Sequence, residues 1–248
     1  MVTTLGRAKI NLTLDILGLR DDGYHEIATV MQSLALADTL TLTRQEEGIS
    51  LSVDLPGLET DERNLAYRAA ALIMNECHVR GGVHIDIAKR IPVAAGLAGG
   101  SADAAATLRG MNELHGLGLS DAELCALGAR IGSDIPFALM GGTIYATGRG
   151  EMMRRIADFP KTYVVLAKPP VAVSTPWAYR SYDAHPPEYH PDNAAFIEAL
   201  ARGEVDAILD SASRKKDGEK LLLRVALMPA KFIAAKKREG LMKNLSDT

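Results

Sequence analysis

Hydrophobic and polar residues alternate strictly near the start of the chain. The segment KINLTLDI, residues 9–16, sets an aliphatic side chain on every second position. This period of two predicts a half-buried strand with Lys9, Asn11 and Thr13 on one face and the aliphatic side chains on the other. Similar short apolar runs predict further strands at 29–36, 39–43, 49–53, 83–88, 143–147 and 162–167, with Ala37 and Asp38 separating the first two.

Other segments carry apolar residues at helical spacing. They predict helices at 64–77, 102–112 and 121–131. Ser120 precedes the last of these, and Glu123 stands at its third position, which is the pattern of a capping box. The proline-containing stretch 183–191 predicts a loop. Antiparallel-looking strands mixed with helices favour the α+β class over a doubly wound sheet.

The segment PVAAGLAGGSADAAA, residues 92–106, is the most informative stretch of the chain. Its glycines allow a close backbone approach, and Ser101 is a suitable N-cap for the alanine-rich helix that follows. A glycine-rich loop that enters a helix directs backbone N–H groups and the positive end of the helix dipole at one point, which suits phosphate. The alternative is a tight turn packed against a helix. Because glycine, alanine and a capping serine all agree, we favour a phosphate-binding loop.

Composition narrows the class of protein. The chain has 248 residues, 47% of them hydrophobic, and a formal net charge of −3. It can form one large domain or two small ones, and its charge argues against nucleic acid as a general partner. Cys77 and Cys125 are too few for a disulfide framework or a zinc site, and we expect buried free thiols. With no secretory signal and no long apolar run, we expect a soluble, cytoplasmic protein without a membrane segment.

The last stretch, residues 210–248, differs from the rest in charge. It holds ten Lys or Arg residues against five Asp or Glu residues. Weak helical patterns occur at 221–227 and 232–237. Such a basic segment can bind nucleic acid or an acidic partner, but we favour a solvated helix face.

Three places could carry chemistry. Lys9 and Asn11 share one face of the first strand, although such a pair is often only surface. Tyr24 and His25 follow the turn 20–23, where they could stack on a flat ligand and hydrogen-bond it. Asp134 lies between a glycine and a proline, where it could be a simple helix cap or a catalytic base. We find no Walker loop, protein-kinase motif or metal-binding cluster.

The motifs AKINL at 8–12, PVAAGLAGGS at 92–101 and GSDIP at 132–136 together resemble the GHMP small-molecule kinases. The resemblance runs from about residue 8 to about residue 209. It implies a two-lobed α+β fold with the active site in the cleft between the lobes, an N-terminal lobe at 1–155 and a C-terminal lobe at 156–248. The motifs RDDGYH at 20–25 and ATGRGE at 146–151 look like one member of this family, which phosphorylates the methylerythritol hydroxyl of a cytidine diphosphate sugar-alcohol during non-mevalonate isoprenoid synthesis.

The resemblance also implies roles for individual residues. Asp134 would accept the proton of the attacking hydroxyl, Lys9 would pair with Asp134, and Asn11 would position the alcohol. Tyr24 and Tyr179 would sandwich the cytosine, and His25 would hydrogen-bond it. ATP would lie against Asn64, Pro92, Gly96, Leu97, Ala98, Gly99, Gly100, Ser101 and Ala102. Mg²⁺ would bridge the phosphates with few direct protein ligands, so we expect no protein metal site.

The sequence departs from the family after about residue 209. A third small-residue motif of the type G-S-G-P-T is expected there, and we do not find it. A divergent ending, a shift of reading frame and a chain that binds nucleotide without turnover are all compatible with this. The alternatives to the expected activity are therefore another GHMP kinase, such as a homoserine kinase, and an inactive nucleotide-binding protein. Nothing in the sequence indicates the oligomeric state.

Overall fold

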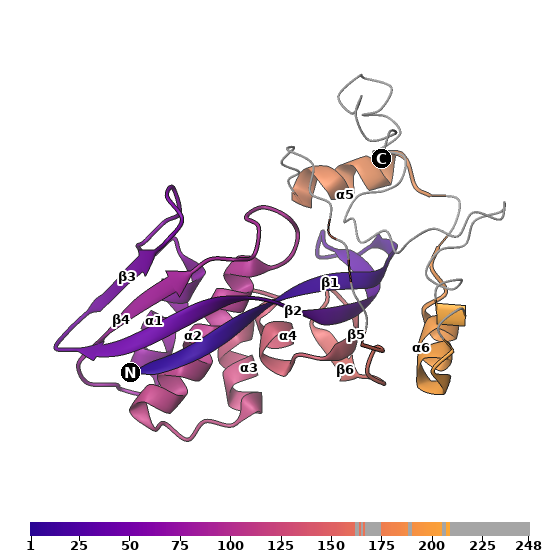
Figure 1. The fold of residues 1–248 in the computed structure, drawn as a ribbon. Helices are drawn as coiled ribbons and strands as arrows, with labels where there is room; N and C mark the ends of the chain where they lie inside the picture. The colour runs from indigo at the N-terminus through magenta and orange to yellow at the C-terminus, as the bar shows by residue number, and fades with distance from the viewer. Residues whose placement is uncertain (162–163, 165, 167–174, 188–189, 205–206, 209–248) are drawn as a thin grey trace, which may run out of the picture.

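The computed structural model describes residues 1–161, 164, 166, 175–187, 190–204 and 207–208 (Figure 1). The strands are β1 (Val2–Leu19), β2 (His25–Gln45), β3 (Ile49–Val53), β4 (Gly82–Ala88), β5 (Thr143–Thr147) and β6 (Met152–Arg155). The helices are α1 (Leu65–Glu76), α2 (Gly99–His115), α3 (Asp121–Ala129), α4 (Ile135–Met140), α5 (Thr175–Ala184) and α6 (Asn193–Arg202). The α+β class is confirmed. The predicted strand 162–167 and the helical patterns of the basic stretch lie largely or wholly outside the described residues.

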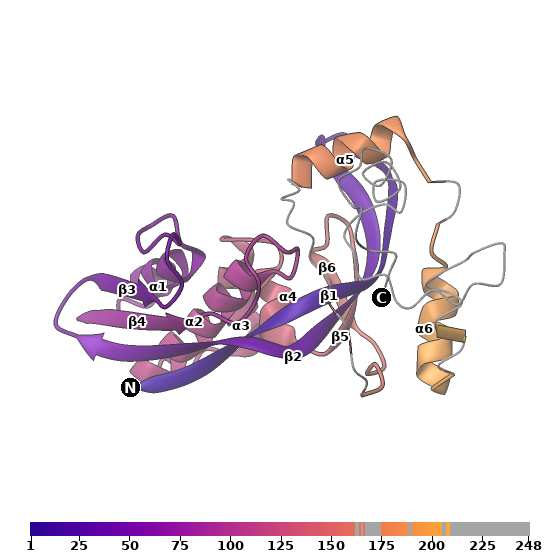
Figure 2. The same ribbon diagram turned by 45° about the horizontal axis from the view of Figure 1, so that its top comes forward.

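The long hairpin of β1 and β2 is the axis of the sheet. The two strands pair antiparallel from Val2↔Leu42 to Leu19↔His25. On its other edge β2 pairs with β4 over 39–45 and with β5 over 29–32, and β3 and β6 complete the two ends. Figure 2 shows β4 and β5 beside opposite ends of β2. The hairpin therefore joins the two halves of the sheet.

The predicted break between strands 29–36 and 39–43 is wrong, because β2 is continuous. Asp38 suggested a turn, yet it pairs with Gly6 of β1 and is fully buried. On the β1 side, the register of the β1–β2 pairing shifts between Arg7 and Lys9, and the two strands continue to pair on both sides of this shift. The local turn signal of Ala37 and Asp38 is overridden because Asp38 finds long-range partners, described below.

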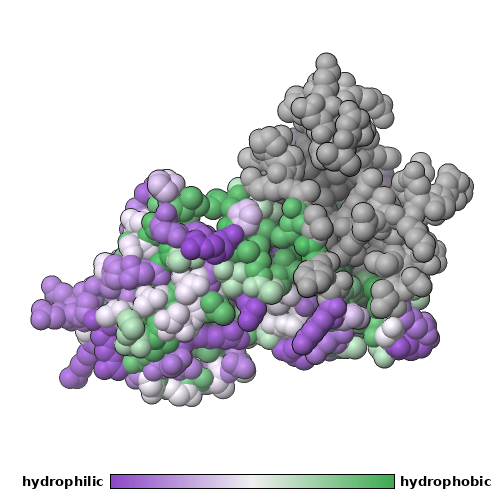
Figure 3. All heavy atoms as spheres, viewed as in Figure 1, coloured by the Kyte–Doolittle hydropathy of each residue, from purple (hydrophilic) through white to green (hydrophobic). Residues whose placement is uncertain are grey.

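Helices cover one face of the sheet. α2 contacts β1, β2, α1 and α4, and a core of aliphatic and alanine side chains fills the space between helices and sheet. The first turn of α2 lies very close to β1, since a Cβ at Gly6 would be 2.7 Å from the carbonyl oxygen of Ala102. In the view of Figure 3, polar residues dominate the end of the molecule with β3 and β4, whereas hydrophobic residues gather toward the middle.

The capping box of α3 is as predicted, and α1 begins one residue later than predicted, but the predicted cap of α2 is wrong. Asn64 caps α1, and Ser120 with Glu123 forms the capping box of α3. α2 begins at Gly99, three residues earlier than expected, and its N-cap is Ala98 in the left-handed conformation with no side-chain cap. Ser101 thus lies inside the first turn and is not the cap. The predicted boundary at 155/156 between two lobes stays a prediction.

Candidate active site

Lys9 lies at the centre of the candidate site. Its side chain is only 9% exposed, and its Nζ donates to Asn11 Oδ1 at 2.9 Å. Asn11 Nδ2 in turn donates to the hydroxyl of Thr29 on the neighbouring strand, at 2.7 Å. The amide of Asn11 is therefore held between the ammonium group and β2. The predicted face of β1, with Lys9 and Asn11 side by side, is confirmed.

Asp134 faces the same ammonium group. Its Oδ1 lies 3.7 Å from Lys9 Nζ, and its side chain is 38% exposed. Asp134 is the N-cap residue of α4, but its carboxylate makes no capping hydrogen bond. The simple-cap alternative is therefore not what the geometry shows. A carboxylate held beside a buried cation and open to solvent on its other side is placed to accept a proton.

The segment 92–98, which we call the phosphate loop, has an unusual backbone. Ala94, Gly96 and Ala98 all have positive φ, at 52°, 71° and 56°. For the two alanines this left-handed conformation costs about 1–2 kcal/mol each. The loop is attached to β1 because the backbone N–H of Lys9 donates to the carbonyl of Leu97 at 3.1 Å.

The left-handed Ala98 immediately precedes α2. The first backbone N–H groups of α2 have no acceptor within the helix. The first turn of any α-helix has N–H groups without intrahelical acceptors, and α2 has neither a side-chain cap nor an acidic residue there. The N–H groups of Gly99, Gly100 and Ser101 therefore form a donor cluster at the positive end of a 17-residue helix. Such a cluster fits the phosphates of a nucleotide.

Asn64 lies at the start of α1, beside this donor cluster. A Cβ at Gly100 would be 3.5 Å from Leu65 Cδ1. The side chain of Asn64 accepts from the N–H of Ala66 at 2.9 Å and donates to the carbonyl of Glu59 at 2.8 Å. The residue is near the phosphate loop, as expected, but its amide is engaged in capping α1. Its predicted contact with adenine stays a prediction.

The predicted cytosine-binding residues are only partly brought together. The rings of His25 and Tyr179 stack, with centroids 4.6 Å apart and planes inclined by 19°. Tyr24 is 58% exposed, and the guanidinium of Arg149 lies 4.8 Å from its ring centroid; a sandwich of cytosine between Tyr24 and Tyr179 stays a prediction. Burial and the nearby Asp134 carboxylate raise the pKa of the Tyr179 phenol. Tyr179 thus lies within electrostatic reach of Asp134.

Three residues at this end of the molecule were missed. Asp183 Oδ1 lies 2.8 Å from His25 Nε2, and Arg149 covers Tyr24. Glu26 joins two turns, because it accepts from Arg20 Nη1 at 2.6 Å and from the N–H of Gly148 at 3.1 Å. The motif at 146–151 pointed to Arg149 without a role. Asp183 stands in the stretch predicted as loop, which gave no signal for a contact with His25.

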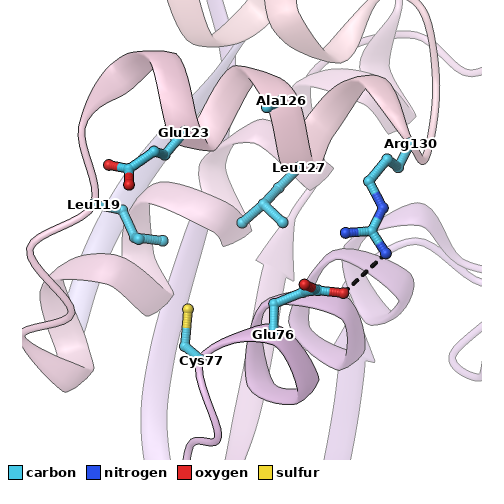
Figure 4. Close-up of a pocket in the computed structure, with 7 residues that line it drawn as sticks. All are labelled: Glu76, Cys77, Leu119, Glu123, Ala126, Leu127 and Arg130. Atoms are coloured by element: carbon cyan, nitrogen blue, oxygen red, sulfur yellow. Dashed lines mark hydrogen bonds and ion pairs between the residues drawn. The ribbon is translucent and has the colours of Figure 1, made fainter.

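A second concave region lies away from these residues. A hollow of about 300 Å³ lies between the end of α1 and α3, and Figure 4 shows the residues that line it. It is lined by Glu76, Cys77, Leu119, Glu123, Ala126, Leu127 and Arg130. Glu76 and Arg130 form an ion pair of 2.9 Å across its rim. Cys77 and Cys125 are free thiols, and both are half-buried rather than fully buried as predicted.

Metal and membrane features can be assessed for the described residues. Within them, no group of three or more His, Cys, Asp or Glu side chains could hold a metal ion. In the same part of the chain, no helix combines the length and apolar character needed to cross a membrane.

The phosphate loop, the N-terminus of α2 and the Lys9–Asp134 pair define a class of protein. Residues 64–142 match the family model described as GHMP kinases N terminal domain. This match contains α1, the phosphate loop and Asp134. The crystal structure of a phosphomevalonate kinase from Streptococcus pneumoniae is 12% identical over 97% of this chain and 80% of its own, with a TM-score of 0.62, and shares the fold.

Similar proteins narrow this class to one family. A 4-diphosphocytidyl-2-C-methyl-D-erythritol kinase from Synechococcus sp. (strain JA-2-3B'a(2-13)) is 58% identical over 73% of this chain and 58% of its own length. The enzyme of that name from Shouchella clausii is 52% identical over 81% of this chain and 68% of its own. A crystal structure of 4-(cytidine 5'-diphospho)-2C-methyl-D-erythritol kinase is 36% identical, covers 82% of this chain and 72% of its own, and has a TM-score of 0.67.

The chain belongs to the GHMP kinases, in the family of the 4-diphosphocytidyl-2-C-methyl-D-erythritol kinases. The chain spans only part of its relatives' length. It covers 58% of the Synechococcus enzyme described above and 64% of a second Synechococcus enzyme of the same name, about three fifths of each.

Proposed function

We propose that this protein transfers the γ-phosphoryl group of ATP to the methylerythritol hydroxyl of 4-diphosphocytidyl-2-C-methyl-D-erythritol, in the cytoplasm. One observation carries the proposal. The backbone N–H of Lys9 holds Leu97 of the phosphate loop, while its ammonium group lies 3.7 Å from the Asp134 carboxylate. A single residue thereby connects the anion-binding loop to a candidate base, which is the arrangement that phosphoryl transfer to an alcohol requires.

Each step has a residue that supports it. Asp134 accepts the proton as the hydroxyl oxygen forms its bond to the γ-phosphorus, and the bond to the β-phosphate oxygen breaks to release ADP. Lys9 keeps the carboxylate oriented and, with Asn11, stabilises negative charge on the attacking oxygen. The N–H groups at the start of α2 hold the phosphates. Bound Mg²⁺ supplies further neutralisation of the phosphate charge.

The other end of the site supplies the choice of substrate. His25 and Tyr179 already form a flat stack, and Tyr24 presents an exposed ring under Arg149. Rings of this kind bind a nucleobase by stacking. The His25–Tyr179 stack lies near Asp134 through Tyr179, so a cytidine diphosphate substrate bound here would direct its alcohol toward the base.

The direct test is the release of ADP from ATP by the purified chain, with and without the cytidine diphosphate substrate. We expect turnover that depends on this substrate and is absent with homoserine. Turnover with homoserine would assign the chain to the alternative kinase. Binding of an ATP analogue without turnover on either alcohol would support the inactive nucleotide-binding alternative.

Asp134→Asn tests the proposed base. The change keeps the shape of the side chain but removes the proton acceptor, so we expect kcat to fall by about 10²–10⁴-fold, the usual contribution of a general base. The KM for ATP should stay nearly unchanged. Asp121→Asn, at an exposed aspartate in the first turn of α3, is the control. Equal losses in kcat and in ATP binding would remove Asp134 from this role.

Tyr24→Ala tests the nucleobase subsite. Stacking of a base on an aromatic ring contributes about 1–3 kcal/mol, so we expect the KM for the cytidine substrate to rise by about 5–150-fold. The KM for ATP should not change, because Tyr24 lies at the other end of the site. An unchanged KM for the cytidine substrate would exclude Tyr24 from the subsite.

A further inference from the structure

A buried ionic cluster lies behind the phosphate loop. The ammonium group of Lys89 donates to Asp38 Oδ2 at 2.5 Å and to Asp103 Oδ2 at 2.7 Å. The three side chains are 7%, 0% and 6% exposed. None of these residues belongs to the site described above. We call this group the Lys89 cluster.

The Lys89 cluster joins the two ends of the phosphate loop. Lys89 follows β4 and stands just before the loop, whereas Asp103 lies in α2, just after it. Asp38, in the middle of β2, also accepts the backbone N–H groups of Arg90 and Ile91. The segment that enters the loop and the helix that leaves it are therefore fixed to each other and to the central strand.

The ammonium group also lies directly behind the donor cluster of α2. A Cβ at Gly99, the first residue of the helix, would be 3.5 Å from Lys89 Nζ and 3.2 Å from Ile91 Cγ2. The first residue of α2 therefore packs directly on Ile91 and on Lys89. The first helical N–H group thus lies over the side chain of Lys89.

The loop needs such support. Pro92, Val93 and Ala94 are exposed, and Ala94 and Ala98 adopt a strained left-handed conformation. Strained backbone persists only when its surroundings over-determine it. Leu97 and Ile91 pack in the core beneath the loop, and the Lys89 cluster fixes its ends. Donors that are already in place when an anion arrives bind it more tightly than donors that must first be ordered.

Burying the charges of the Lys89 cluster costs free energy, which argues against stabilisation of the fold as the role of the cluster. One ammonium group faces two buried carboxylates, and Asp103 Oδ1 has no hydrogen-bond partner among the described residues. Burial raises the pKa of Asp103 to about 7, against the opposing pull of Lys89. Replacing a buried ion pair by apolar side chains is often neutral or stabilising. A cluster that contributes little to stability and fixes both ends of one loop has a geometric role.

We propose that Lys89 is a positioning residue for the nucleotide, which holds the phosphate loop and the first turn of α2 in their anion-binding geometry. This inference rests on the proposed function, since it assumes that the loop binds ATP. It assigns Lys89 no contact with the reacting atoms. Its effect is on ATP, and it leaves the cytidine end of the site alone.

The test compares Lys89→Met in the full chain with the wild-type protein. We expect at least a tenfold rise in the KM for ATP and in the Kd for a non-hydrolysable ATP analogue measured by calorimetry. The KM for the cytidine substrate should change less than about threefold. Arg90→Met is the control, because this neighbouring cation is exposed and its guanidinium pairs with exposed Asp54 and donates to the Lys89 carbonyl, outside the buried carboxylates; it should leave all three constants unchanged.

A second variant separates positioning from folding. Lys89→Met leaves two buried carboxylates without their cation, so it could fail to fold. Lys89→Met combined with Asp103→Leu leaves one buried carboxylate instead of two, and Asp38 still accepts the N–H groups of Arg90 and Ile91. We expect a protein that folds, is more stable than Lys89→Met and still binds the ATP analogue at least tenfold more weakly than the wild type. A stable double variant with wild-type affinity, or equal losses for ATP and for the cytidine substrate, would overturn the inference.

The calorimetric measurement also distinguishes the two proposals. It needs no turnover, so a wild-type protein that binds the analogue but does not phosphorylate the alcohol refutes the proposed function and leaves the inference to be decided by the variants. A wild-type protein that does not bind the analogue refutes both.

Discussion

The N-termini of α2 and α3 differ in how the backbone N–H groups of the first helical turn are capped. In α3, Ser120 and Glu123 form a complete capping box, and Asp121 and Glu123 place negative charge in the first turn. In α2, a left-handed Ala98 precedes the helix, no side chain caps it, and its first turn holds no acid. One helix uses its N-terminal donors to stabilise itself, whereas the other leaves them for a ligand.

The difference marks the start of α2 as a candidate binding site by what the protein omits there. A capping box stabilises a helix by about 1 kcal/mol, and α2 forgoes this contribution although it is the longer helix. It also carries two alanines in a costly conformation next to the missing cap. Such losses are tolerated at functional sites and offset elsewhere, here by the contacts that fix the loop.

The largest effect is expected from giving α2 the charge of α3. Ser101→Asp places a carboxylate in the first turn of α2, where it competes with phosphate for the same N–H groups and repels it. We expect the KM for ATP to rise by about 10–100-fold, that is by about 1.4–2.8 kcal/mol. The free energy of unfolding should increase by about 0.3–1 kcal/mol, because an acid at this end favours the helix dipole.

The uncharged variant Ser101→Asn is the matched control. It has the same size and can cap, but it does not repel phosphate by charge. If Ser101→Asp and Ser101→Asn raise the KM for ATP equally, steric obstruction rather than charge explains the effect. If neither changes it, the start of α2 does not bind the nucleotide.

A smaller effect is expected from removing the cap of α3. Ser120→Ala deletes the hydroxyl that accepts the N–H of Glu123. We expect the free energy of unfolding to fall by about 0.5–2 kcal/mol with no change in the KM for ATP. Urea denaturation and steady-state kinetics on the same preparation measure both. A rise in the KM for ATP would mean that the N-terminus of α3 also affects nucleotide binding. It would then not differ from the N-terminus of α2 in this respect.

The smallest effect concerns pH. The N–H and hydroxyl of Ser120 lower the pKa of Glu123 in α3, whereas burial raises the pKa of Asp103 in α2 to about 7. Glu123 therefore contributes stability above its ordinary pKa of 4.5 that is lost as pH falls. Folded Asp103 binds more protons than unfolded Asp103 between its ordinary value of 3.8 and about 7, so its contribution falls as pH rises through that range.

The two carboxylates should thus give opposite trends when they are replaced. Relative to the wild type, Asp103→Asn should gain stability as pH rises from about 4 to 7, and Glu123→Gln should lose stability as pH rises through about 4.5. Denaturation curves measured across this range check both slopes. Parallel trends for the two variants would contradict the assigned pKa directions.

The elements that could be predicted from sequence are those fixed by local interactions. Asn64 and Ser120 are within three residues of the N–H groups they cap, so α3 begins where expected and α1 begins within one residue of the predicted start. The start of α2 could not be predicted, because the conformation of Ala98 depends on distant contacts of the loop with β1. The continuity of β2 was missed for the same reason, since Asp38 has its ionic partner 51 residues away.

In the candidate site, too, local patterns could be predicted from the sequence, whereas contacts between distant segments could not. Lys9 and Asn11 could be paired because a strand places alternate residues on one face, and the family motif added Asp134. The partners of His25 and Tyr24 could not be derived, because Asp183 and Arg149 reach them from segments more than 100 residues away. No local pattern encodes which two rings will stack.

The long hairpin of β1 and β2 has a consequence for the order of assembly. Its strands meet through a short turn, whereas the contact between Gln32 and Thr143 of β5 spans 111 residues. The entropy lost on closing a loop grows with its length, and domains emerge from the ribosome N-terminus first. We expect Lys9 and Asn11 to be aligned on the hairpin before Asp134 exists as a partner. The Lys9–Asp134 pair is then among the last contacts that the folding chain forms.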